Sequence, residues 1–440
     1  MEELNDELWK LGILAKTEHN EVAPAQHELA PIYTTTNIAT DHNQLTMEIM
    51  QKVAAKHGLV CLLHEKPFAG VNGSGKHNNW SIATDAGQNL LSPGETPYEN
   101  AQFLLFLCAV IKAVDDYQDL LRISVATAGN DHRLGANEAP PAVVSIFLGD
   151  ELNAVLEAIE NDTPYSGAEK TQMKLGVDVL PKFNRDTTDR NRTSPFAFTG
   201  NKFEFRMLGS SNSIACANIM LNSAVAESLK SYADRLEGAA DFETALHDLI
   251  KKTIKDHKRI IFNGNGYDDA WIAEATEKRG LCNYRTTPDC MPHLLDEKNV
   301  KMLTSQKVYT EIELKSRCEI MLEKRDAAFF PEGFQFLVHR KGIFLDRLDL
   351  LGCCKLEGKC VIFIQQRVSK FIIFIRKFNR GRIECDSLLH AVSLRERACG
   401  NIADNDLKGD DGNLFDKSLP LAELFHKVCG DPRVFQSPHQ

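Results

Sequence analysis

The sequence predicts an α+β fold in which strands group together and pack against long helices. Residues 98–116 and 213–238 form long runs rich in apolar or small side chains, which is typical of buried helices. Residues 202–206 alternate charged and aromatic side chains with the period of two expected of a strand. Strands grouped with long helices favour the α+β class.

The individual elements follow from local signals. Asp41 is of a type that caps helix N-termini and Gly58 of a type that ends helices, so a helix is predicted from Asp41 to about His57. The apolar runs at 59–68 and 140–148 are predicted strands. A further helix is predicted at 240–257, directly after the one at 213–238.

Composition excludes several classes of function. A chain of 440 residues predicts two or three domains, and a net charge of −10 argues against nucleic-acid binding. The most apolar stretch, 361–375, is interrupted by Arg367 and Lys370, so no membrane span is expected. The start of the chain lacks the apolar core of a signal peptide, so the 12 cysteines are expected to be reduced and the protein cytoplasmic.

Composition also changes near Lys324. Residues 1–324 contain 33 Lys and Arg against 46 Asp and Glu, whereas residues 325–440 contain 18 against 15 and hold no Tyr or Trp. We therefore predict one domain at 1–324 and a separate segment at 325–440. A small independent domain and a poorly ordered sequence translated from a shifted reading frame are both consistent with this, and the loss of every Tyr and Trp favours the second.

The segment NEVAPAQHE at 20–28 places two glutamates on either side of a proline. Because Pro24 interrupts a strand, a turn there would bring the carboxylates of Glu21 and Glu28 together. Paired carboxylates suit Mg²⁺ or Mn²⁺. Spacing alone, however, favours two ordinary surface glutamates on a hairpin.

The segment VNGSGKHNN at 71–79 contains two glycines that permit close approach of the backbone to a ligand. It lacks the spacing of a phosphate-binding P-loop. His77 beside these glycines is a candidate metal or phosphate ligand, although a lone loop histidine is more often merely hydrogen-bonded. Lys76 is expected to be solvated.

Two further segments concentrate charge. Arg133 and Glu138 flank a Gly/Asn/Pro loop that suits a substrate flap, although a surface ion pair has the same spacing. On a strand, Lys202, Glu204 and Arg206 would share one face, which can bind phosphate, metal and carboxylate together. The ordinary alternative is an amphipathic strand with a wet charged face.

These motifs resemble glutamine synthetase, and specifically its type III form. NEVAPAQHELAPIY, NGSGKHNNWS, GNDHRLGANEAPP and RNRTSPFAFTGNKFEFRMLGSS occur in the expected order, and the resemblance continues to about Lys324. It implies a glutamine synthetase/guanido kinase-like catalytic domain with an antiparallel sheet and packed helices. It also implies a ligase that uses ATP to join ammonia to glutamate through a γ-glutamyl phosphate.

The resemblance assigns the metal ligands residue by residue. Glu21 and Glu28 match ligands of the metal nearer the glutamate, and His77 and Glu204 match ligands of the metal that orients the ATP phosphates. Mg²⁺ or Mn²⁺ is the implied ion.

The resemblance also assigns substrate contacts. Asn72 and Gly73 match the glutamate-binding loop, and Arg133 and Arg206 match the arginines that hold the glutamate carboxylates.

Three matches concern ATP and catalysis. Arg192 matches a phosphate-contacting arginine, and Lys202 falls at a nucleotide-binding arginine. Glu138 matches the flap glutamate that shields the acyl phosphate and helps to deprotonate ammonium.

Departures from the family pattern leave a second hypothesis open. We expect the family's N-terminal β-grasp domain, one further glutamate ligand for each metal and the helical C-terminal part to be missing, so the catalytic domain is incomplete. The family assembles as homo-oligomeric rings with shared active sites. An inactive truncated relic that at most binds full-length subunits is therefore the alternative to an active ligase. A γ-glutamylamide ligase or guanidino kinase is disfavoured by the context of Glu138.

Overall fold

The computed structural model describes residues 1–136, 139–165 and 193–341, together with strand segments at 172–173, 183–184, 350–356, 359–366, 369–375, 378–379 and 382–383. The chain divides into two compact units, Met1–Leu322 and Glu323–Gln440. The composition-based boundary after residue 324 and the separate origin of the tail stay predictions. No helix among the described residues is long and apolar enough to cross a membrane.

Twelve α-helices lie within the described residues: α1 Glu2–Lys10, α2 Thr36–Lys56, α3 Ala101–Asp116, α4 Gln118–Ile123, α5 Ala128–Arg133, α6 Asp150–Glu160, α7 Ala215–Leu236, α8 Phe242–His257, α9 Asp269–Ala273, α10 Thr287–Cys290, α11 Glu297–Ser305 and α12 Glu311–Lys341. Three short 3₁₀ or π turns, Lys258–Ile260, Glu274–Lys278 and Met291–Leu295, connect the later helices.

The strands of the first unit are β1 Ala15–Asn20, β2 His27–Pro31, β3 Gly75–Trp80, β4 Ile146–Phe147, β5 Gln172–Met173, β6 Phe183–Asn184, β7 Phe196–Phe198 and β8 Phe203–Gly209. The central sheet has the order β3-β8-β7-β4. Its β3–β8 and β8–β7 pairs are antiparallel, whereas β7–β4 is parallel. The predicted α+β class is confirmed, with one parallel pair at the edge of the sheet.

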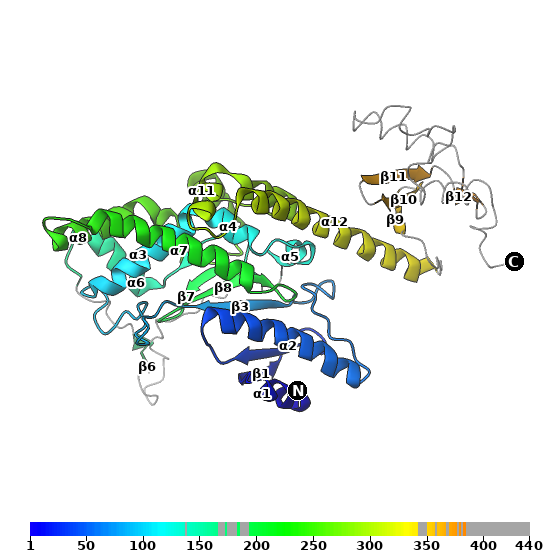
Figure 1. Cartoon of the computed structure of the whole chain (residues 1–440), viewed down its shortest axis with the longest axis horizontal. Helices are drawn as coiled ribbons and strands as arrows, with labels where there is room; N and C mark the ends of the chain where they lie inside the picture. Colours follow the sequence, from blue (N-terminus) through cyan, green and yellow to red (C-terminus); the bar gives the residue numbers. More distant parts are fainter. Residues whose placement is uncertain are drawn as a thin grey trace. The chain divides into compact units, whose positions relative to one another are not determined.

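Helices α3 and α7 cover one face of this sheet, and α2 with the β1–β2 hairpin lies on its other side (Figure 1). Phe203 and Phe205 alternate with charged residues along β8, and both are fully buried among side chains of α3 and α7. Asn78 Nδ2 of β3 donates to Asn218 Oδ1 of α7 at 2.9 Å. The face of β3 and β8 away from α7 is therefore the one that carries the candidate functional residues.

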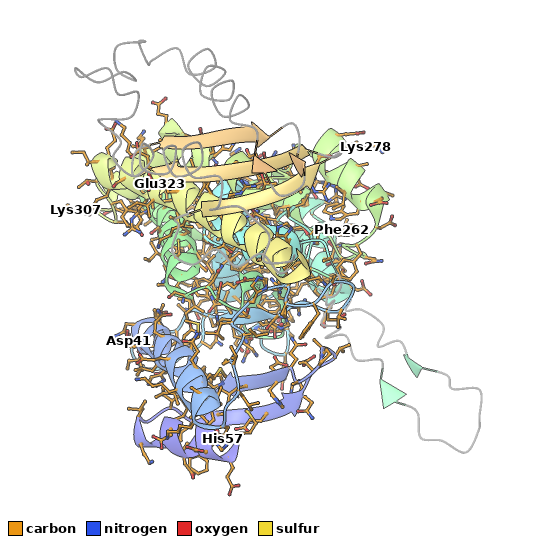
Figure 2. All side chains as sticks on the ribbon, turned by 90° about the vertical axis from the view of Figure 1, so that its right-hand side faces the viewer. Asp41, His57, Phe262, Lys278, Lys307 and Glu323 are labelled. Carbon is orange, nitrogen blue, oxygen red and sulfur yellow. The ribbon has the colours of Figure 1, made fainter. Side chains whose placement is uncertain are left out.

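The first residues of the chain form a small layer of their own. Leu4 and Leu8 of α1 pack with Val53 of α2, against a partly buried Leu29 of β2. Helix α2 begins at Thr36, with Thr35 as its extended N-cap, so the prediction that Asp41 caps it is wrong. Asp41 lies within the helix, as Figure 2 shows, because the chain already turns helical at the threonines before it.

Of the other predicted elements, four are confirmed and two differ in the structure. The helices at 98–116, 213–238 and 240–257 are confirmed as α3, α7 and α8, and the strand at 202–208 as β8. The run 59–68 forms no strand, because among the described residues no strand pairs with it, and Val60 is 82% exposed. The run 140–148 contributes only the two residues of β4.

In the second unit, β9 Leu350–Leu356, β10 Lys359–Gln366 and β11 Ser369–Ile375 form an antiparallel sheet in the order β11-β10-β9. β12 Phe378–Asn379 pairs with β13 Arg382–Ile383. The apolar stretch at 361–375 thus contributes to two paired strands.

Candidate functional site

The β1–β2 hairpin brings the two predicted glutamate ligands together. Its register pairs His19 with Glu28, and the amide of Glu21 donates to the carbonyl of Gln26 across the turn at 2.9 Å. Ala25 completes the turn with a φ of 55°. The turn that Pro24 predicts is therefore present.

A histidine that the sequence prediction overlooked completes this cluster. His19 Nε2 lies 2.7 Å from Glu21 Oε1 and 2.8 Å from Glu28 Oε2. The available signal was its position two residues before Glu21 on an extended strand, which places both side chains on one face. One ligand atom from each of the three residues lies within 4.8 Å of the others.

The electrostatics of this cluster fit a cation. Partial burial and the neighbouring Glu21 carboxylate raise the pKa of Glu28 above its usual value, and His19 offsets only part of that effect. Two crowded carboxylates and an imidazole are a donor set that Mg²⁺ or Mn²⁺ accepts. His19, Glu21 and Glu28 are thus a candidate divalent-metal site.

The glycine loop Asn72–Gly75 is bonded to this hairpin. Gln26 Nε2 donates to the carbonyl of Gly73 at 3.2 Å, and the amide of Ser74 donates to the carbonyl of Glu65 at 2.8 Å. Asn72 and Gly73 are half-buried beside these bonds. The loop passes directly into β3, where His77 is exposed between the half-buried Lys76 and the buried Asn78.

Lys76 is not solvated as the sequence predicts. Its Nζ donates to the carbonyls of Ser210 and of Asn212, the latter at 2.8 Å, and lies 3.4 Å from Met47 Sδ. Burial lowers the pKa of Lys76 to about 8, although the charge of Glu65 acts in the opposite direction. Lys76 therefore joins β3 to α2 and to the segment after β8.

Strand β8 places Glu204 and Arg206 side by side on the face predicted for them. Arg206 Nε and Nη2 donate to Glu204 Oε2 at 3.0 and 2.8 Å. Arg206 is only 2% exposed, so the charged face is not the wet surface of an ordinary amphipathic strand. Glu204 pairs across the sheet with Asn79, and the register shifts at His77, between Lys76 and Asn78. Lys202 lies before β8, in the turn after β7.

Arg133 lies at the end of α5, where its side chain is 3% exposed. Nη1 donates to the carbonyl of Leu208 at 3.1 Å, and Nη2 donates to the carbonyl of Arg206 at 3.2 Å. Burial lowers the pKa of Arg133 to about 10. Arg133 is buried, so the alternative that it forms a surface ion pair is wrong. Glu138 and Arg192 lie outside the described residues, so their predicted roles stay predictions.

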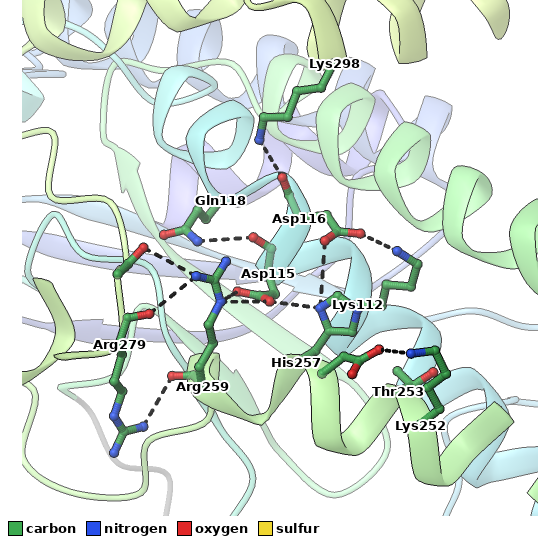
Figure 3. A network of polar contacts seen from close by, with 12 residues as sticks. Lys112, Asp115, Asp116, Gln118, Lys252, Thr253, His257, Arg259, Arg279 and Lys298 are labelled. Atoms are coloured by element: carbon green, nitrogen blue, oxygen red, sulfur yellow. Dashed lines mark hydrogen bonds and ion pairs between the residues drawn. The ribbon is translucent and has the colours of Figure 1, made fainter. Parts of the chain in front are cut away.

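A second cluster also combines two carboxylates with a histidine. Asp115 and Asp116 of α3 and His257 of α8 bring one ligand atom each within 4.8 Å of the others. Here two cations already occupy the carboxylates, as Figure 3 shows: Arg259 Nε donates to Asp115 Oδ1 at 2.9 Å, and Lys112 bonds Asp116. This cluster is an ion-pair network that joins α3 to α8.

The fold and the candidate site together define an α+β protein in which a carboxylate–histidine cluster, a glycine loop and an arginine-bearing strand are joined. Residues 1–142 match the family model for the glutamine synthetase catalytic domain, and residues 245–328 match that for the glutamine synthetase C-terminal domain. The chain belongs to the glutamine synthetase family.

Over the residues that match, relatives in this family are 50–55% identical to the chain. A glutamine synthetase of Butyrivibrio fibrisolvens is 55% identical over 338 residues, which are 76% of this chain and 47% of the relative. The type-3 glutamine synthetase of Dictyostelium discoideum is 52% identical over 326 residues, 73% of this chain and 44% of the relative. A glutamine synthetase of Bacteroides fragilis is 50% identical over 331 residues, 74% and 45%. The chain spans about half the length of the curated relatives it matches.

Proposed function

We propose that this chain carries metal- and glutamate-binding parts of a glutamine synthetase, which uses ATP to join ammonia to glutamate through a γ-glutamyl phosphate. One observation supports this most directly. Segments far apart in the sequence are hydrogen-bonded in one place: the hairpin to the glycine loop through Gln26, and α5 to β8 through Arg133. The side chains assigned by the resemblance to metal and glutamate come from these segments.

In this proposal, His19, Glu21 and Glu28 hold one divalent ion, Mg²⁺ or Mn²⁺, and His77 and Glu204 contribute to a second. The ions would offset the negative charge that develops when a carboxylate is phosphorylated. Their donor atoms are imidazole nitrogens and carboxylate oxygens, which suit either ion.

The remaining roles concern the substrates. Arg206 would bind a glutamate carboxylate, since Glu204 holds its guanidinium in a fixed plane on β8. Asn72 and Gly73 would contact the amino-acid part of the substrate. Arg133 would hold β8 in place, because its N–H groups donate to the backbone carbonyls of Leu208 and Arg206.

The ATP and flap assignments rest on the resemblance. Arg192 and Lys202 would contact phosphate or nucleotide, and Glu138 would shield the acyl phosphate from water. We also propose a homo-oligomer in the cytoplasm. The six cysteines within the described side chains are free, which is consistent with a reducing compartment.

The test is glutamine formation by the purified full chain from glutamate, ammonia and Mg²⁺-ATP. Activity that Glu204→Ala abolishes would support the ligase. A folded chain that makes no glutamine, yet binds a full-length type-3 relative in a pull-down, would support the alternative of an inactive interaction partner.

A further inference from the structure

A buried carboxylate outside every assigned role lies behind the glycine loop. Glu65 is 3% exposed, although it precedes the loop in an irregular segment. Its Oε1 accepts from the amide of Ser211 at 2.9 Å and also from the Ser211 hydroxyl. A charged group buried in this way costs free energy unless its surroundings compensate it.

Three glycines from three separate segments make room for Glu65. A Cβ at Gly129 of α5 would lie 2.2 Å from Glu65 Oε2, and one at Gly209 of β8 would lie 2.4 Å from Oε1. A Cβ at Gly73 would lie 2.6 Å from the Glu65 carbonyl oxygen. Because real Cβ atoms do not approach oxygen this closely, glycine is required at each position for Glu65 to lie where it does.

Glu65 also lies near two cations, the half-buried Lys76 and the buried Arg133. Its charge raises the pKa of both Lys76 and Arg133, opposing the larger effect of their burial. Arg133 is itself enclosed by the loop, since a Cβ at Gly75 would lie 2.1 Å from its Nη2. The carboxylate therefore favours the charged form of both side chains, and its packing against Gly129 and Gly209 fixes it in place.

We propose that Glu65 is a positioning residue for glutamate binding, an inference that rests on the proposed function. Its carbonyl fixes Ser74 in the glycine loop, and its carboxylate is packed between α5 and the end of β8. Oε1 accepts from the Ser211 amide and Oε2 packs against Gly129, so in this proposal Glu65 acts through the loop and Arg133 and does not itself bind substrate.

The experiment compares Glu65→Gln with Asp119→Asn in the full chain. Asp119 is a matched control because it is 4% exposed as a side chain, pairs with Lys298 and lies outside the proposed site. Glutamate and Mn²⁺ affinities are measured by calorimetry, and amide hydrogen exchange is measured without ligand. Circular dichroism checks folding, and Glu65→Asp, which keeps the charge, replaces Glu65→Gln if the latter does not fold.

We expect Glu65→Gln, which keeps an acceptor for Ser211 but loses the carboxylate charge, to weaken glutamate binding by about tenfold and to leave Mn²⁺ affinity unchanged. Exchange at residues 72–75 should accelerate in Glu65→Gln and not in Asp119→Asn. Equal glutamate affinity in both variants, or unchanged exchange at 72–75, would overturn the positioning role. A wild-type chain that binds no glutamate would instead overturn the proposed function, while the exchange data would still decide whether Glu65 holds the loop.

Discussion

Two clusters in this chain each contain two carboxylates and a histidine, in opposite surroundings. His19, Glu21 and Glu28 lie on an exposed to half-buried hairpin, where the carboxylates crowd each other. In the other cluster, Asp115 is 2% exposed as a side chain and bonds Arg259 and His257. The difference shows that ligand composition alone does not define a metal site.

What separates the two clusters is the source of positive charge. In the buried cluster, Arg259 and Lys112 supply it from the chain itself, which leaves a divalent ion little to gain. In the hairpin cluster the two carboxylates contact His19 and each other. The first arrangement contributes to folding, and the second is suited to binding a cation.

The largest expected effect separates the clusters by stability. Asp115→Ala should lower the free energy of unfolding by about 3 kcal/mol, because it leaves Arg259 and His257 without their buried partner. Glu28→Gln should change it by less than about 1 kcal/mol, because its side chain is half exposed. Urea unfolding followed by tryptophan fluorescence measures both variants. Equal losses would remove the distinction.

For metal binding we expect the larger effect at the hairpin cluster and none at the buried cluster. Mn²⁺ at about 100 times its dissociation constant should stabilise the wild-type chain by about 2.7 kcal/mol for each site. Glu21→Gln combined with Glu28→Gln should remove one bound ion from the calorimetric stoichiometry, and Asp116→Asn should remove none. Loss of an ion in the Asp116 variant would assign a metal to the buried cluster instead.

The sequence predicted much of this arrangement, for identifiable reasons. Pro24 between two glutamates predicted the turn, which is present. The alternation at 202–206 predicted that Lys202, Glu204 and Arg206 share a face; Glu204 and Arg206 lie side by side, whereas Lys202 lies before β8. These are local patterns, in which the backbone period or a proline determines geometry. The resemblance supplied the roles, which geometry alone does not test.

What the sequence did not predict depends on contacts between distant residues. Lys76 was expected in solvent, but carbonyls more than 130 positions away enclose it. Glu65 carried no recognisable pattern, because its pocket is made by glycines from α5 and β8. The run 59–68 has the composition of a strand, but no strand in the described part of the chain pairs with it.

Lys76 is the opposite case to the hairpin cluster, because it is a half-buried cation that bonds neutral carbonyls. Its pKa is lowered to about 8 in the folded chain from an ordinary value of 10.5, so the unfolded chain binds more protons between these pH values. Stability should therefore rise with pH from about 8 to 10.5 through this group. The slope of unfolding free energy against pH should be smaller in Lys76→Met, and an unchanged slope would show that Lys76 does not titrate in this range.

The smallest expected effect is the pH dependence of stability that Glu28 causes in the hairpin cluster. Because the pKa of Glu28 is raised from 4.5, the folded chain binds more protons than the unfolded chain just above that pH. The contribution of Glu28 to stability is therefore present below pH 4.5 and is lost as pH rises through the raised pKa, and Glu28→Gln should remove this loss. Saturating Mn²⁺ should reverse the sign, since a bound ion favours the deprotonated carboxylates and competes with protons. Unfolding measured against pH with and without Mn²⁺ tests both signs, and a slope that the ion does not change would mean that the hairpin cluster holds no metal.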